Sequence, residues 1–414
     1  MLREIKIAMI GGGGKNIGGS ILYLLNSGRV QNIEFALFGR TYKNMERNIA
    51  LANRIKNHNG CSIKVYDTLE SALEGADIVM HCATAGYGEY GGYRSYGVPQ
   101  GGHVMYVGEK ISKLCPDAWV LGATNPPEVP LTALLKRFGI EKSIGLCNAP
   151  MIVKNTLSAI SGTDEKNILM RGIGLNHDVW YYDFRIGEET EPEKIVDMLN
   201  QRIDQPSLSD HPWFRLFPEW RIAIKNNIAL LKETGYLLSP AGGTRRLKGL
   251  PVSSKEYGAI MKRPSKEDFE NCLNEDVSIE DMLRITGRCG GGVPVYTGRI
   301  IESILLEDDV QHSALVPNKG AYEDAPDSLH IQADVSFEKG KIVIHGAKKL
   351  SDFIKGMLTA RFIQNDLLTS ALAYQDDLLL KKAIMVMPER YEFEQAITFE
   401  SGSEKSVEPF IPFN

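Results

Sequence analysis

The chain has 414 residues, of which 43% are hydrophobic and 24% are charged. These proportions are ordinary for a globular protein, and the length predicts two or three domains. A net charge of −5 at pH 7 argues against general binding of nucleic acid or of a membrane surface. No signal peptide precedes the first apolar stretch, and no run approaches about 18 apolar residues, so neither export nor a transmembrane helix is expected.

The cysteines indicate a reducing compartment. Six are scattered along the chain without a CxxC pair: Cys61, Cys82, Cys115, Cys147, Cys272 and Cys289. This pattern is typical of reduced thiols rather than of a disulfide framework, which predicts a cytoplasmic protein. Most of these thiols are expected to be small buried groups, and only Cys147 stands in a context that suggests a further role.

Residues 1–150 alternate between short apolar runs and amphipathic stretches. The expected strands are 5–10, 33–38, 62–65, 78–83, 118–122 and 143–146. The expected helices between them are 17–25, 43–56, 104–114 and 131–138. Strands that alternate with helices predict right-handed βαβ crossovers, and therefore an α/β fold with a Rossmann-type, doubly wound parallel sheet. We expect this segment to be a dinucleotide-binding domain.

Residues 151–414 are expected to form a second domain, of α+β type, that binds substrate and metal and mediates oligomerisation. Its expected elements are a strand at 168–175, helices at 220–233 and 279–286, a hairpin at 329–344 that turns at 339–341, and a long helix at 355–380. Within the first domain, the glycine- and tyrosine-rich segment 86–102 breaks the βα rhythm. A long loop there predicts a lid over the crevice at the carboxyl ends of the strands.

A glycine-rich turn directly follows the first expected strand. Gly11, Gly12, Gly13 and Gly14 come after residues 5–10, and Lys15 and Asn16 open the next helix. Glycines let the backbone approach a pyrophosphate, whose charge is stabilised at the N-terminus of a helix. We therefore predict that Gly11, Gly12, Gly13, Lys15 and Asn16 bind NAD. Because Asn16 replaces the third glycine of GxGxxG, a plain tight turn is the alternative.

The end of the second expected strand bears on the choice between NAD and NADP. It reads Phe38-Gly39-Arg40-Thr41, without the carboxylate that would accept a hydrogen bond from the ribose 2′-hydroxyl. Arg40 and Thr41 could instead accept a 2′-phosphate, so NADP stays an alternative. Arg40 could equally stack on adenine or face solvent. Thr84, just after the fourth expected strand, is a further predicted cofactor contact.

Three later segments resemble the signature order of glycoside hydrolase family 4. They are Ala123-Thr124-Asn125-Pro126-Pro127, Gly145-Leu146-Cys147-Asn148-Ala149-Pro150 and Gly174-Leu175-Asn176-His177-Asp178-Val179-Trp180. Weaker matches follow at 288–292, 300–304 and 316–320. The resemblance implies a fold similar to that of lactate and malate dehydrogenases.

The resemblance also implies a route that departs from the usual pair of carboxylates. In that family NAD removes hydride from C3 of the sugar, and the resulting ketone acidifies the proton on C2. A divalent metal, usually manganese, holds the C2 and C3 oxygens. A base takes the C2 proton, the glycosidic group is eliminated, water adds, and the hydride returns to the sugar.

Cys147 and His177 are the metal ligands that the resemblance implies. A metal that binds hydroxyls and polarises a carbonyl needs few protein ligands and open coordination positions, which a thiolate and an imidazole would leave. Without the surrounding motifs, a single cysteine and a distant histidine would be read as core residues. Asn125 and Asn148 resemble the family's contacts to the sugar hydroxyls and to nicotinamide; a simple turn is the alternative at Asn125.

The expected substrate is the glycoside of an anionic sugar. Family members with a Cys-Asn-x-Pro motif tend to act on 6-phospho-glucosides, and residues 147–150 fit this pattern. Arg288 stands where the family places an anion-binding arginine. Arg94, Arg245 and Arg246 could add to such a clamp, because arginine binds oxyanions through two hydrogen bonds. Each of these three could also be a surface residue.

The chain departs from the family where its tyrosine base would stand. Ser239-Pro240 is followed by Ala241-Gly242-Gly243-Thr244-Arg245-Arg246, without a tyrosine. Tyr236 is the nearest candidate base, with Tyr257 and Tyr296 as alternatives. Asp178 and Glu89 are the candidate acids, although either could be a cap or a surface group. These departures suggest a divergent branch, and arginines in place of tyrosines make sulfoquinovose or uronic acid glycosides an alternative to 6-phospho-glucosides.

Two other function classes compete with this reading. A 2-hydroxy acid dehydrogenase would share the glycine turn and the Asn-Pro dipeptide, but it would normally show Arg-x-Asp beside the lid and His-Gly at the catalytic strand. The chain has Arg94-Ser95-Tyr96 and His177-Asp178 instead. A non-catalytic dinucleotide sensor would have no use for Cys147 and His177. The family resemblance further implies a homodimer or homotetramer.

Overall fold

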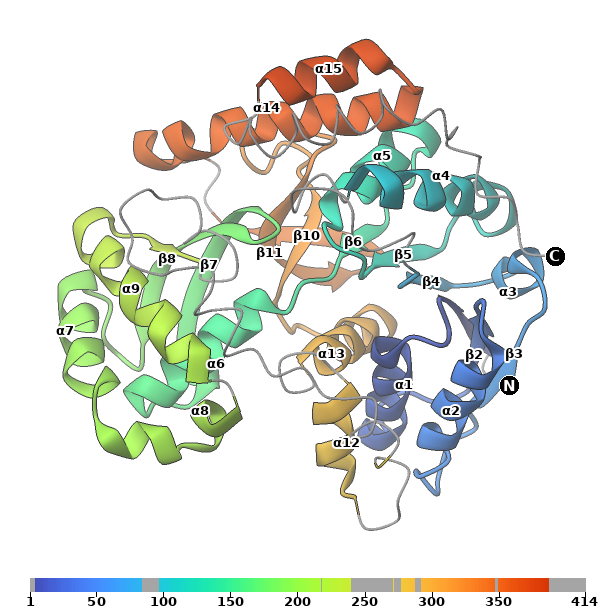
Figure 1. Ribbon diagram of the computed structural model, residues 1–414, viewed down its shortest axis with the longest axis horizontal. Helices are drawn as coiled ribbons and strands as arrows, with labels where there is room; N and C mark the ends of the chain where they lie inside the picture. Colours follow the sequence, from blue (N-terminus) through green and yellow to red (C-terminus); the bar gives the residue numbers. More distant parts are fainter. Residues whose placement is uncertain are drawn as a thin grey trace, which may run out of the picture.

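The computed structural model describes residues 4–83, 97–216, 218–239, 271, 277–286, 292–346 and 349–386. In this part of the chain the strands join into one sheet of order β3-β2-β1-β4-β5-β6-β10-β11-β7-β8-β9, with β12 paired to β11 (Figure 1). None of the helices searched there combines the length and the apolar character that crossing a membrane would require.

The N-terminal half of the sheet is parallel. Its strands are β1 (Ile5–Ile10), β2 (Ile33–Phe38), β3 (Ser62–Val65), β4 (Ile78–His81), β5 (Trp119–Gly122) and β6 (Ser143–Gly145). The connecting helices are α1 (Lys15–Ser27), α2 (Tyr42–Ala52), α3 (Leu69–Leu73), α4 (Gly97–Leu114) and α5 (Glu128–Phe138). One apolar cluster joins the sheet to α1 and α2, and a second joins it to α3, α4 and α5. Both faces are covered, as predicted for a doubly wound sheet.

The remainder of the chain extends this sheet with antiparallel strands. They are β7 (Ile168–Leu175), β8 (Asp178–Ile186), β9 (Leu237–Leu238), β10 (His312–Pro317), β11 (His330–Glu338) and β12 (Lys341–His345). The helices are α6 (Ala149–Ser161), α7 (Pro192–Ile203), α8 (Pro212–Leu216), α9 (Pro218–Thr234), α12 (Ile279–Thr286), α13 (Gly292–Leu306), α14 (Asp352–Tyr374) and α15 (Asp377–Met385). Short 3₁₀ turns lie at Glu165–Asn167 and Pro206–Asp210.

The predicted division at residue 150 is crossed in two places. β6 pairs with β10 through Gly145 and Leu315, so the strands of both halves form one ladder. α13 returns to the N-terminal half and packs on α1, where a Cβ added to Gly298 would lie 2.1 Å from the ring of Tyr23. The division into domains 1–150 and 151–414 therefore stays a prediction.

Two predictions about elements were wrong. The expected long helix at 355–380 is two helices, because Gln375 adopts a left-handed conformation with φ of 56° that ends α14. Residues 97–102, expected to belong to a loop, form the first turns of α4. The three glycines in this segment have low helix propensity and argued against a helix, but the tertiary structure can override the propensity of single residues. Strand β8 was not predicted from the sequence.

Candidate functional site

The glycine turn is held by the Phe38 backbone carbonyl and by the Asn48 side chain. The N–H groups of Gly11 and Gly12 donate to the Phe38 carbonyl oxygen, at 2.9 and 2.8 Å. The buried Asn48 amide donates to the carbonyl oxygens of Gly12 and Gly14, at 2.7 and 3.0 Å. Gly14 caps α1 without a side-chain hydrogen bond, so no cap side chain competes for the first N–H groups of the helix. This arrangement suits a pyrophosphate.

Replacing Gly11 by alanine is expected to weaken NAD binding by more than about tenfold. Gly11 has φ of +89°, and its added Cβ would lie 2.7 Å from the Ala83 amide nitrogen, a backbone atom that cannot move aside. Gly75→Ala is the matched control, because Gly75 also has positive φ but no atom within 4 Å. The control should lose about 1 kcal/mol of stability and keep its NAD affinity. Fluorescence titration with NAD measures the affinity of each variant. Equal NAD affinities of Gly11→Ala and wild type would contradict the assignment of Gly11.

The predicted ribose contacts lie at the carboxyl end of β2. Arg40 and Thr41 are both exposed. Burial lowers the pKa of His103 on α4, and the nearby Arg40 charge lowers it further. Arg40 is therefore close to α4 at the edge where β1 lies between β2 and β4, and crevices of this kind hold dinucleotides in doubly wound sheets.

Asn125 and Asn176 connect two distant parts of the site. Asn125 follows β5 and is joined to Pro126 by a cis peptide bond, whereas Asn176 lies in the turn between β7 and β8. The fully buried Asn176 amide donates to the Asn125 side-chain oxygen at 3.0 Å. The β7–β8 turn is thus tied to the carboxyl edge of the parallel strands. His177, in the same turn, has φ of 60°, a conformation that non-glycine residues adopt rarely and often at functional sites.

Cys147 and Asn148 lie between the end of β6 and the start of α6. The Cys147 side chain is 6% exposed and packs against Ala149 and Leu315. The Asn148 amide nitrogen is buried and has no hydrogen-bond partner in the described part of the chain. A Cβ added to Gly292 would lie 2.6 Å from that nitrogen, so a larger residue at the start of α13 would push the Asn148 amide aside. An unsatisfied buried amide fits a ligand contact, because such a group is costly without a partner.

The donor set fits a metal that is shared with a ligand. Across the residues that the structure describes, no group of three or more His, Cys, Asp or Glu side chains could hold a metal ion by itself. A metal held by Cys147 and His177 would therefore have two protein donors, and substrate or water would fill its other positions. An open coordination sphere of this kind is what catalytic metals need.

Two tyrosines lie near Cys147, a proximity that the sequence did not predict. Burial raises the pKa values of Tyr181 and Tyr296, and the nearby Cys147 thiol raises both further. The Tyr296 hydroxyl donates to the Ser313 carbonyl oxygen. A raised pKa opposes proton abstraction, so these hydroxyls are poorly suited to act as the C2 base. The aromatic run after His177 was the one signal in the sequence for Tyr181.

Tyr236, the predicted base, lies away from the His177 end of β8. Its hydroxyl donates to the Ser351 side-chain oxygen at 2.8 Å. β9 pairs with Tyr181 and Trp180, and the Ser239 N–H then donates to the Val179 carbonyl oxygen at 2.7 Å. Ser239 rather than Tyr236 therefore lies level with the β7–β8 turn. The structure does not favour the base assignment, which stays a prediction.

Asp178, the predicted acid, forms a buried ion pair. Its carboxylate lies 3.5 Å from the Arg361 guanidinium on α14, and the two side chains are 11% and 9% exposed. Proton donation to a leaving group would need this carboxylate to face the substrate, whereas the pairing gives it a partner within the protein. The geometry favours a positioning role next to His177.

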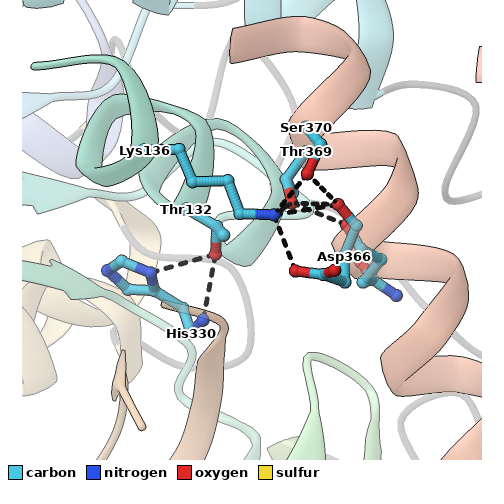
Figure 2. A network of polar contacts seen from close by, with 7 residues as sticks. Thr132, Lys136, His330, Asp366, Thr369 and Ser370 are labelled. Atoms are coloured by element: carbon cyan, nitrogen blue, oxygen red, sulfur yellow. Dashed lines mark hydrogen bonds and ion pairs between the residues drawn. The ribbon is translucent and has the colours of Figure 1, made fainter. Parts of the chain in front are cut away.

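α14 also holds α5, the helix that begins just after Asn125. The Lys136 ammonium on α5 donates to the Asp366 carboxylate at 2.7 Å, and to the Thr369 and Ser370 hydroxyls at 3.0 and 2.7 Å (Figure 2). Burial lowers the pKa of Lys136. One turn earlier on α5, Thr132 contacts His330 of β11 (Figure 2). Helix α14 therefore contacts both Asp178, next to His177, and α5, which begins just after Asn125.

Some predicted site residues lie outside the described residues. They are Thr84, Glu89, Arg94, Arg245, Arg246, Tyr257 and Arg288. The anion clamp therefore stays a prediction. Among the predicted residues that the structure describes, the glycine turn, Asn125 and Cys147 lie at the carboxyl edge of the parallel strands, and the Asn176 contact brings the His177 turn to the same edge.

Known proteins with similar sequences are glycosidases. An alpha-galacturonidase of Thermoanaerobacter italicus is 26% identical, over 98% of this chain and 96% of the relative. A probable 6-phospho-beta-glucosidase of Bacillus subtilis is 28% identical over 96 residues, a match that covers 23% of this chain and 22% of the relative.

Solved structures share the whole fold. A 6-phospho-alpha-glucosidase from gut microorganisms, in complex with NAD and glucose-6-phosphate, has a TM-score of 0.78 at 17% identity, over 97% of this chain and 98% of that chain. The 6-phospho-beta glucosidase of Thermotoga maritima with manganese, NAD+ and glucose-6-phosphate has a TM-score of 0.72 at 18% identity, over 96% and 99%. A lactate dehydrogenase from a deep-sea metagenome library has a TM-score of 0.59 at 15% identity, over 90% and 100%.

The predicted similarity to the dehydrogenase fold is therefore confirmed. Two family profiles decide between the competing function classes. Residues 87–163 match the family 4 glycosyl hydrolases, and residues 172–389 match the C-terminal domain of family 4 glycosyl hydrolases. The chain belongs to the family 4 glycosyl hydrolases, as the motifs around Asn125, Cys147 and His177 predicted.

Proposed function

We propose that this protein hydrolyses glycosides of an anionic sugar, of the 6-phospho-glucoside type, with NAD and a divalent metal, most simply manganese. The observation that carries the proposal is the hydrogen bond between Asn125 and Asn176. It joins the His177 turn to the sheet edge at which the glycine turn opens α1 and Cys147 follows β6. A dinucleotide, a metal and a sugar would meet at that edge.

When bound, NAD would accept and return a hydride, and the metal would polarise the sugar oxygens. The chain itself supplies the binding groups. The turn at Gly11–Gly13 and the start of α1 would hold the pyrophosphate, with Arg40 and Thr41 near the ribose. Cys147 and His177 would hold the metal, and the unsatisfied Asn148 amide would orient a sugar hydroxyl.

Of the candidate anions on the sugar, phosphate, sulfonate and carboxylate, the comparisons support two. Structures of similar fold contain glucose-6-phosphate, which supports a 6-phosphate as the recognised group. The alpha-galacturonidase relative, however, matches nearly the full length of both chains, and this favours a carboxylate as the second candidate. Arg245 and Arg246, where the family's tyrosines would stand, could bind either anion.

Two further features belong to the proposal. The four cysteines that the structure describes, Cys61, Cys82, Cys115 and Cys147, form no disulfide bond with one another, which supports a reducing compartment such as the cytoplasm. A homodimer or homotetramer is proposed from the family resemblance, and sedimentation velocity would test it.

The test offers nitrophenyl glycosides that carry a 6-phosphate or a 6-carboxylate, in heavy water with NAD, manganese and a reductant. We expect nitrophenol release that requires NAD and metal together, with deuterium at C2 of the product. The preferred glycoside identifies the anion. Net reduction of NAD on hydroxy acids, without nitrophenol release, would overturn the proposal in favour of a dehydrogenase.

A further inference from the structure

A pocket of about 180 Å³ lies outside the candidate site. Its walls come from α6, from the start of β7, from α13, from the start of β10, and from β11. None of the described residues that we assign to cofactor, metal or sugar lines it. The volume is below the roughly 300–1,000 Å³ of pockets for drug-sized ligands, so the pocket suits a small ion or metabolite.

Three cationic side chains from three separate elements line this pocket: Lys154 of α6, Arg171 of β7 and Arg299 of α13. Within the described part of the chain, the Lys154 ammonium has no hydrogen bond or ion pair. Arg171 lies 3.6 Å from the Asp183 carboxylate, which is 61% exposed and therefore screened by water. Inside the pocket, Asp334 lies near Lys154 and Arg171, and Glu165 lies near Arg299, so these two carboxylates are the groups that could offset the three cations.

The carboxylates of the pocket oppose an anion only weakly. Glu165 is 45% exposed and lies 4.0 Å from Arg299, the limit of an ion pair. Burial raises the pKa of Asp334 to about 7, against the lowering effect of its hydrogen bond with Ser313. Near neutral pH a large share of Asp334 is therefore protonated and can donate a hydrogen bond. Gln311 and Ser313 add neutral polar groups to the lining.

We propose that this pocket binds a phosphate group, with Lys154 and Arg171 as its principal cationic contacts. The excess of cations over ionised carboxylates is between one and two charges, which matches the charge of about −1.5 to −2 that a phosphate monoester carries at pH 7. Arginine and lysine are the side chains that bind phosphate, arginine through two hydrogen bonds and lysine as a point charge.

The phosphate site is separate from the sugar site but adjacent to it. Tyr296 lines the pocket, and Cys147 is close enough to Tyr296 to raise the pKa of its hydroxyl further. A phosphate in the pocket would thus be one side chain away from a proposed metal ligand. The inference goes beyond the proposed glycosidase activity, because the sugar's own anion would bind elsewhere.

Calorimetric titration of the full chain with inorganic phosphate tests the proposal. The pocket variant is Lys154→Met combined with Arg171→Met, and the matched control is Lys166→Met, whose side chain is 75% exposed and does not line the pocket. An Arg288→Met background removes the predicted contact to a sugar phosphate. We expect at least tenfold weaker phosphate binding in the pocket variant and unchanged binding in the control.

Equal phosphate affinity in wild type and pocket variant, or no binding at millimolar phosphate, would overturn the proposal. Lys154→Glu, which changes only one partly exposed side chain, gives a second test in case the double variant does not fold; it should abolish binding. Glycerol 3-phosphate distinguishes the sources of the phosphate group. Tighter binding than that of inorganic phosphate assigns the pocket to a phosphomonoester, and equal binding assigns it to free phosphate.

Discussion

Replacing Cys147 by serine, or His177 by asparagine, is expected to abolish manganese binding and with it the NAD-dependent release of nitrophenol. The two side chains are the proposed protein donors, and the described residues contain no group of three or more His, Cys, Asp or Glu side chains that could hold the metal instead. Loss of a direct ligand should exceed the roughly 10–100-fold that removal of a supporting group costs. Electron paramagnetic resonance of added Mn²⁺ measures binding independently of activity.

Cys115→Ser is the matched control for this prediction. Cys115 is also a buried thiol, and burial raises its pKa to about 11, so it is not a ready metal ligand. The control should bind manganese as the wild type does. Retained manganese affinity in both the Cys147 and the His177 variants would refute the metal assignment, whereas NAD binding should survive in either case because the glycine turn is intact.

Replacing Arg361 by methionine is expected to destabilise the fold by about 3–5 kcal/mol, because the Asp178 carboxylate would remain buried without its partner. Asp178→Asn should destabilise less, and the double variant should recover part of the loss. Because Asp178 directly follows His177, manganese affinity should also fall, by roughly 10–100-fold. Chemical denaturation and manganese titration of the two single variants and the double variant form a complete cycle.

An exposed ion pair provides the comparison. Lys225 and Asp204 form a pair with side chains 49% and 66% exposed, so Lys225→Met should cost no more than about 1 kcal/mol and leave manganese binding unchanged. If Arg361→Met lowered stability but left manganese affinity untouched, the pair would be merely structural. If Asp178→Asn lost activity with stability and manganese affinity intact, Asp178 would be the acid after all.

Helix α14 contacts residues that border both ends of the site. Arg361 contacts Asp178 beside His177, and Asp366 accepts from Lys136 on α5, the helix that follows Asn125. The Arg361–Asp178 pair is buried on both sides, whereas in the Lys136–Asp366 pair only the lysine is buried, so loss of the first pair should cost more. The site is therefore expected to depend on residues that touch neither sugar nor cofactor.

The sequence by itself determined the N-terminal fold and the location of the cofactor turn. Strands β1 to β6 were predictable because short β-branched runs that alternate with amphipathic stretches have few other ways to bury their apolar surface. The position of Gly11–Gly14 directly after a buried strand predicted a phosphate-binding turn. Cys147 and His177 were predicted as metal ligands only through the surrounding motifs, since an isolated cysteine or histidine has no local pattern that marks it.

Only the tertiary structure decided which distant residues meet. The pairing of Asn125 with Asn176, of Asp178 with Arg361 and of Lys136 with Asp366 joins positions 51 to 230 residues apart. The sequence alone made Tyr236 the nearest candidate base, whereas in the structure its hydroxyl donates to Ser351. Local propensity and periodicity report the burial of each segment, whereas a site depends on side-chain contacts between segments that only packing brings together.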